Sequence, residues 1–154
     1  MNDFEGLKAI VTGGASGIGE ATALMLKSRG ANVCVFDRNQ PKDPITGIRY
    51  VICDITNRSE VVKHVTDVAK NGLDILINNA GIGATGDVTQ ATDEEWHKVL
   101  DVNIVGTARM SAAAIPFLKN SSNAAIVNVS SIVATDGFPQ RARSEEHTSE
   151  LQSH

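Results

Sequence analysis

The chain has 154 residues, of which 42% are hydrophobic, and it carries a formal net charge of −4. This size fits one globular domain, and the acidic balance argues against a nucleic-acid partner or an anionic membrane surface. No apolar run reaches the length of a membrane span and the N-terminus lacks a signal-peptide pattern, so we expect a cytoplasmic protein.

A glycine-rich turn at residues 12–19 (TGGASGIG) separates a predicted strand at 7–11 from a predicted helix at 20–29. Such a turn presents backbone N–H groups and a helix N-terminus to a phosphate. Glycine suits it because a side chain would block the approach of the phosphate and because the turn requires unusual backbone angles. The pattern favours nucleotide binding over the alternative of a plain turn.

Strands and helices then alternate along the chain. The predicted strands lie at 32–36, 49–53, 73–78 and 124–130, and the predicted helices lie at 60–70 and, after a start at 92–95, at 96–118 with a break or bend. Ser59 is expected to cap the helix at 60–70. Apolar strands alternating with helices predict an α/β fold with a doubly wound parallel sheet. The strand at 124–130 is apolar on both faces and is expected to be buried.

Residues 143–154 (RSEEHTSELQSH) show neither an apolar period nor turn residues at useful positions. The string also matches the translation of a widely used short-read sequencing adapter. We therefore expect a dinucleotide-binding domain at 1–142 and a non-native tail at 143–154, which is left out of the fold prediction. The alternative is a disordered tail that belongs to the protein.

The second predicted strand is followed by Asp37, eighteen residues past Gly19. An acidic side chain at this place accepts hydrogen bonds from the adenosine ribose and repels a 2′-phosphate, which favours NAD over NADP. The neighbouring Arg38 could hold such a phosphate, so NADP stays open as the less favoured cofactor.

Polar residues also follow the other strands. Asp54 follows the third strand, residues 78–81 (NNAG) follow the fourth, and Ser130 and Ser131 follow the fifth. The carboxyl ends of parallel strands share one edge of a sheet, where α/β proteins bind their ligands. These residues are therefore expected to form one rim with the glycine-rich turn.

Taken together, residues 7–142 resemble the short-chain dehydrogenase/reductase family. The matching features are TGGASGIG, Asp37, Asp54, NNAG, Asn103 within DVNIVGT and the serine pair within IVNVSS. The resemblance implies a Rossmann fold with about five strands in the order 3-2-1-4-5. It also implies an oxidoreductase that transfers a hydride between NAD(P) and a small-molecule alcohol or carbonyl substrate.

The resemblance further assigns roles to individual residues. The pyrophosphate cradle would be formed by Gly13, Ser16, Gly17, Ile18 and Gly19. Asp37 would bind the ribose, and the rest of the cofactor would meet Asp54, Ile55, Asn79, Ala80 and Gly81. Asn103 would hold a helix bend and a water of the proton relay, and Ser131 would polarise the substrate carbonyl. No metal site is expected.

One element of the family pattern is missing. The family uses a tyrosine in Tyr-x-x-x-Lys as its acid/base, where the lysine lowers a phenol pKa that is otherwise about 10. The only tyrosine of this chain is Tyr50, inside the third predicted strand. We therefore expect an inactive fragment. The resemblance also implies that the full-length form is a homodimer or homotetramer. The apolar edge of its fifth strand is expected to favour aggregation.

Two other functions compete with this one. The first is a non-catalytic module that binds NAD, in which Asn103 and Ser131 would have no evident use. The second is a methyltransferase on a similar sheet, in which NNAG and the serine pair would have no role.

Overall fold

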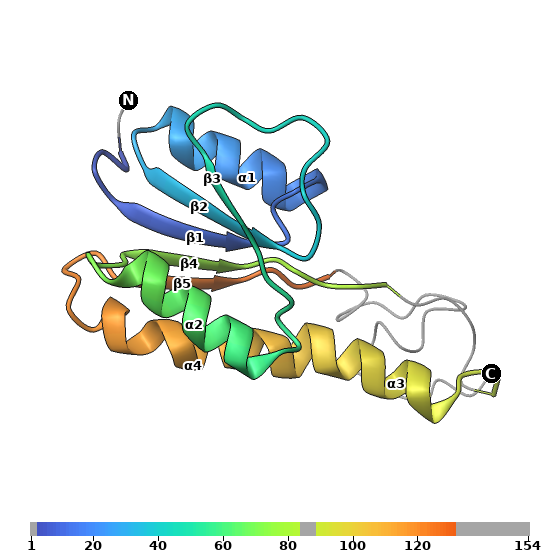
Figure 1. The fold of residues 1–154 in the computed structure, drawn as a ribbon. Coiled ribbons are helices and arrows are strands. Elements are labelled where there is room, and N and C mark those ends of the chain that lie inside the picture. The colour runs from blue at the N-terminus through green and yellow to red at the C-terminus, as the bar shows by residue number, and fades with distance from the viewer. Residues whose placement is uncertain (1–2, 84–88, 132–154) are drawn as a thin grey trace.

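A computed structural model describes residues 3–83 and 89–131 of the chain. Its centre is a five-stranded parallel sheet with the strand order β3-β2-β1-β4-β5, which confirms the predicted α/β fold and its topology (Figure 1). The strands are β1 (Lys8–Thr12), β2 (Asn32–Asp37), β3 (Arg49–Ile52), β4 (Ile75–Asn78) and β5 (Ala125–Asn128).

Helices cover both faces of the sheet. They are α1 (Gly17–Ser28), α2 (Arg58–Ala69), α3 (Asp93–Leu100), a π-helical segment η1 (Asp101–Gly106) and α4 (Thr107–Leu118). Helix α1 lies on one face, whereas α2 and α4 lie side by side on the other (Figure 1).

The core consists of two apolar clusters, one on each side of the sheet. Ala9 and Val11 of β1 pack toward Leu26 of α1, and Ile10 packs with Val65 of α2 and Met110 of α4. Successive side chains of a strand point to opposite faces, so one apolar strand contributes to both clusters. This explains why the central strands have continuous apolar runs.

Helix boundaries differ from the prediction at two places. Helix α1 begins at Gly17, three residues before the predicted start, because the glycine-rich turn continues directly into helical backbone. Helix α2 is capped by Asn57 and not by Ser59, since the Asn57 side chain accepts hydrogen bonds from the backbone N–H groups of Ser59 and Glu60. Ser59 itself lies inside the first turn and donates its hydroxyl to Asn57 Oδ1 at 2.7 Å.

The predicted break in the long helix is the π-helical segment η1, which joins α3 to α4 without a loop. Helix α3 begins at a capping box, in which Thr92 accepts from the Glu95 N–H and the Glu95 side chain accepts from the Thr92 N–H. A π-helical segment inserts extra backbone into a helix and is frequent at functional sites.

The prediction that the fifth strand is buried is wrong. All four residues of β5 are exposed, because among the described strands it pairs with β4 alone. The predicted tail at 143–154 lies outside the described residues. Within the described part of the chain, no helix has the length and apolar composition that crossing a membrane requires.

Candidate functional site

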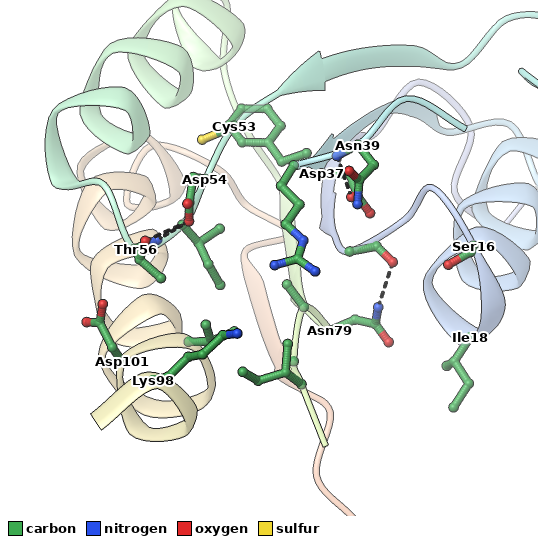
Figure 2. Close-up of a pocket in the computed structure, with 18 residues that line it drawn as sticks. Ser16, Ile18, Asp37, Asn39, Cys53, Asp54, Thr56, Asn79, Lys98 and Asp101 are labelled. Atoms are coloured by element: carbon green, nitrogen blue, oxygen red, sulfur yellow. Dashed lines mark hydrogen bonds between the residues drawn. The ribbon is translucent and has the colours of Figure 1, made fainter. Parts of the chain in front are cut away.

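A cavity of about 590 Å³ opens at the carboxyl ends of the strands (Figure 2). It lies between the glycine-rich turn, the ends of β2, β3 and β4, and the helical stretch of α3 and η1. Nine of the predicted site residues line it: Gly13, Ser16, Ile18, Asp37, Asp54, Ile55, Asn79, Ala80 and Gly81. Four others do not: Gly17, Gly19, Asn103 and Ser131.

Glycine is needed in the turn for two different reasons. Gly19 packs so tightly that a Cβ there would lie 2.3 Å from the Gly13 carbonyl oxygen and 2.4 Å from Asn79 Nδ2. Gly17 has nothing within 4 Å of such a Cβ, but its φ of +59° lies in the left-handed region that favours glycine. Gly19 therefore shapes the turn by close packing, and Gly17 shapes it by its backbone angle.

The N-terminus of α1 has no side-chain cap. Ser16 occupies the N-cap position, yet its hydroxyl makes no capping hydrogen bond. The first backbone N–H groups of a helix have no intrahelical partner, and the positive end of the helix dipole attracts an anion there. Since Ser16 and Ile18 line the cavity, this end of α1 can receive a phosphate.

Asp37 ties the end of β2 to the turn. One of its carboxylate oxygens accepts a hydrogen bond from the Ala15 N–H at 3.0 Å, and the other accepts from the Asn39 N–H at 2.9 Å. Each carboxylate oxygen has a second lone pair, so Asp37 can still accept hydrogen bonds from the hydroxyls of a ligand.

At the end of β3, Asp54 is held by a tight local turn. Its Oδ1 accepts from the Thr56 N–H at 2.9 Å and from the Thr56 hydroxyl at 2.8 Å. The preceding Cys53 is buried, and this burial raises the pKa of its thiol to about 11. Cys53 is therefore a neutral part of the cavity wall and not a nucleophile at neutral pH.

Ile55 connects the cavity to the π-helical segment. Its side chain is buried and packs against Gly106, where an added Cβ would lie 2.7 Å from Ile55 Cδ1. The glycine that ends η1 thus makes room for a residue of the cavity wall.

Two neighbouring asparagines at the end of β4 join the strands. Asn79 Nδ2 donates to the carbonyls of Thr12 at 3.0 Å and Gly13 at 3.1 Å, and Figure 2 shows Asn79 directed at the turn. Asn78 is buried, and its Nδ2 donates to Ser111 Oγ at 3.0 Å and to Asn128 Oδ1 at 2.9 Å. These hydrogen bonds tie the end of β4 to the glycine-rich turn, to α4 and to β5.

Asn103 lies in η1 and holds the segment that follows β4. Its side chain accepts from the Ile82 N–H at 2.9 Å and donates to the Ile82 carbonyl at 3.1 Å. Its own carbonyl accepts from the Thr107 hydroxyl at 2.9 Å. Ser131 follows β5 and is exposed. Both residues stand apart from the cavity lining.

The sequence prediction missed several residues that line the cavity, among them Asn39, Thr56, Lys98 and Asp101. Lys98 and Asp101 come from α3 and η1, where their spacing of three residues places them on one side of the helix. That spacing is the only sequence signal for them, and it also describes an ordinary solvated helix surface.

Comparison with known proteins points in the same direction as the geometry. A family model described as short chain dehydrogenase matches residues 8–143. An uncharacterized oxidoreductase of Staphylococcus aureus (strain N315) is 36% identical over 133 residues, which are 80% of this chain and 58% of that protein. A 3-ketodihydrosphingosine reductase of Bacteroides thetaiotaomicron is 34% identical over 132 residues, which are 84% of this chain and 49% of that protein.

A solved structure is also similar. The ligand-free aldohexose dehydrogenase of Thermoplasma acidophilum superimposes with a TM-score of 0.86 at 30% sequence identity, covering 94% of this chain and 56% of the other. The chain thus spans about half the length of the relatives that it matches. The family model covers most of the sequence and the fold agrees with it, so this chain belongs to the short-chain dehydrogenase family.

Proposed function

We propose that the described domain binds a nicotinamide dinucleotide in the cavity at the carboxyl edge of the sheet. The observation that carries the proposal is one cavity with the uncapped N-terminus of α1 on one wall and the carboxylate of Asp37 on another. The first suits a pyrophosphate, and the second suits the hydroxyls of a ribose.

The residues present fit this cofactor. Gly13, Ser16 and Ile18 would hold the pyrophosphate, with Gly17 and Gly19 shaping the turn that presents them. Asp54 and Ile55 would face the adenine, and Asn79, Ala80 and Gly81 would line the nicotinamide ribose. The cofactor, when bound, supplies or accepts the hydride, and the chain supplies the geometry.

We propose NAD as the preferred cofactor and NADP as the less favoured one. The carboxylate of Asp37 would accept hydrogen bonds from both ribose hydroxyls, whereas a 2′-phosphate would bring negative charge against it. Arg38 also lines the cavity and provides the argument for NADP.

In the whole protein we propose hydride transfer between NAD(P) and the carbon of a small-molecule alcohol or carbonyl. The reductase and dehydrogenase names of two relatives support this class of reaction. Ser131 would polarise the substrate oxygen, and Asn103 would hold the bend in η1 and a water of the proton relay.

For the chain of 154 residues alone, we propose binding without turnover. Its only tyrosine, Tyr50, lies in β3 and accepts a hydrogen bond from the Ile45 N–H at 3.2 Å, and it is not part of the cavity lining. This observation also favours the second candidate function, a module that binds NAD without catalysis.

A binding titration tests the proposal. NADH fluorescence should reveal a saturable site on the chain, NAD should compete better than NADP, and no alcohol or carbonyl should be turned over. Asp37→Ala should weaken NADH binding about tenfold or more, because a hydrogen bond to a charged group contributes about 1.5–3 kcal/mol. Asp67→Ala is the matched control, since Asp67 is an exposed acid paired with Arg49 away from the cavity.

Failure to bind NADH would overturn the proposed cofactor. Measurable dehydrogenase activity would overturn the proposed lack of turnover. Restored activity in a longer chain that contains Tyr-x-x-x-Lys would favour the enzyme over the binding module.

Three further proposals concern the protein outside the site. We propose a cytoplasmic location, a homodimer or homotetramer for the full-length form, and a non-native origin for residues 143–154. Sequencing the locus across the codon for Ala142 tests the last of these. A genomic continuation that encodes RSEEHTSELQSH would contradict it.

A further inference from the structure

Lys98 and Asp101 are oppositely charged neighbours on the same wall of the cavity. Lys98 lies in the last turn of α3 and Asp101 opens η1, and both line the cavity. Residues three apart on a helix lie close enough to form an ion pair. Such a pair would neutralise the lysine and leave this wall without charge.

The structure shows a different arrangement. Figure 2 shows the carboxylate of Asp101 and the amine of Lys98 pointing away from each other. Asp101 Oδ1 instead lies 2.8 Å from Nη1 of Arg109 in α4. Among the residues that the structure describes, no ion pair involves Lys98.

Burial explains why Asp101 pairs with Arg109. The Arg109 side chain is only 15% exposed, compared with 42% for Asp101, so the guanidinium needs a counter-charge more than the exposed Lys98 does. The pair therefore links Asp101, the first residue of η1, to Arg109 in the first turn of α4.

The other acids of the cavity are also engaged elsewhere. The carboxylate of Asp37 accepts the N–H groups of Ala15 and Asn39, and Asp54 accepts the N–H and hydroxyl of Thr56. Among the described residues, neither carboxylate forms an ion pair with Lys98, so its amine is available to an anionic ligand in a concave site, where charge attracts ligands of opposite sign.

We propose that Lys98 is a further dinucleotide-binding residue, which attracts the anionic phosphates of the cofactor. We assign Arg109 as a positioning residue that withholds Asp101 from Lys98. This inference rests on the proposed function, since it concerns the same cavity and the same class of ligand. It adds residues of α3, η1 and α4 to a site otherwise built at the ends of the strands.

Substitution of Lys98 tests the proposed role of this residue in binding the phosphates. Lys98→Gln should weaken NADH binding about three- to tenfold at low salt, which is the range expected for one partly screened charge. The loss should shrink as the ionic strength rises, and Lys98→Arg should retain the affinity. Lys63→Gln, at an exposed lysine of α2 outside the cavity lining, is the matched control and should bind like the unaltered chain.

Two ligands distinguish an interaction of Lys98 with the phosphates from an interaction with the base. ADP-ribose should lose affinity on Lys98→Gln as NADH does, and adenosine should not. Equal losses for both ligands, or no loss for either, would overturn the assignment of Lys98 to the phosphates. A chain that binds none of these ligands would instead overturn the proposed function.

A rescue experiment tests the role of Arg109. Arg109→Gln should free Asp101 to pair with Lys98 and weaken NADH binding about as much as Lys98→Gln. Adding Asp101→Asn should restore the affinity, which a merely structural role of Arg109 would not allow. Thermal unfolding verifies that each variant is folded. If Arg109→Gln does not fold, Lys98→Gln and Asp101→Asn are compared: the second must retain the affinity that the first loses.

Loss of affinity without rescue, or unchanged affinity in a folded Arg109→Gln variant, would overturn the positioning role. Lower affinity in a folded Asp101→Asn variant would overturn it as well.

Discussion

Strands β4 and β5 are neighbours in the sheet, and they have similar sequences, ILIN and AIVN. Their residues pair in parallel register, with Leu76 opposite Ile126 and Asn78 opposite Asn128. Yet every residue of β4 is buried and every residue of β5 is exposed. The comparison shows that composition decides whether a segment forms a strand, whereas position in the sheet decides how much of it is buried.

The difference has a simple geometric cause. Strand β4 lies between β1 and β5, and its side chains reach both core clusters, one under α1 and one under α2 and α4. Strand β5 is the last strand of the described sheet and contributes no residue to either cluster. Two pairs of substitutions and one single substitution test this contrast, from the largest expected effect to the smallest.

The largest effect is expected for paired truncations at Leu76 and Ile126. Leu76→Ala should lower the free energy of unfolding by about 2–5 kcal/mol, because it opens a cavity in a packed core. Ile126→Ala should cost less than about 1.5 kcal/mol, since Ile126 is 39% exposed and loses fewer contacts. Urea unfolding of both variants measures the difference, and equal losses would contradict the described burial.

A smaller effect is expected at the asparagine pair. Asn78→Ala should cost about 1–2 kcal/mol, because it removes two partly buried hydrogen bonds that link β4 to α4 and β5. Asn128→Ala should cost about 0.5 kcal/mol or less, since Asn78 keeps its bond to Ser111 and Asn128 is exposed. A reversed order in urea unfolding would show that β5 contributes more than its exposure implies.

The smallest effect on stability is expected at Val127, which is 47% exposed on β5. Val127→Lys should change the free energy of unfolding by about 0.5 kcal/mol or less, the usual range for a surface position. It should nevertheless reduce self-association, because a charge on an edge strand opposes pairing with another chain. Light scattering at high protein concentration measures this, and unchanged association would show that aggregation does not proceed through β5.

By itself, the sequence determined the order of the elements and the composition of the rim. Strands that alternate with helices form a parallel sheet, and parallel strands end at one edge, so Asp37, Asp54 and the NNAG segment had to meet the glycine-rich turn. Only local patterns were needed for this, and the cavity lining agrees with it for nine predicted residues.

The tertiary structure alone decided which helix residues face that cavity and which strand stays exposed. Lys98 and Asp101 look like a solvated helix surface until the helix is placed against the sheet, and the partner of Asp101 is eight residues away across η1. Likewise, the apolar residues of β5 predict a buried strand, and the order of the described strands leaves it at the edge of the described sheet. Both outcomes depend on contacts between residues that lie far apart in the sequence. Local periodicity carries no information about such contacts.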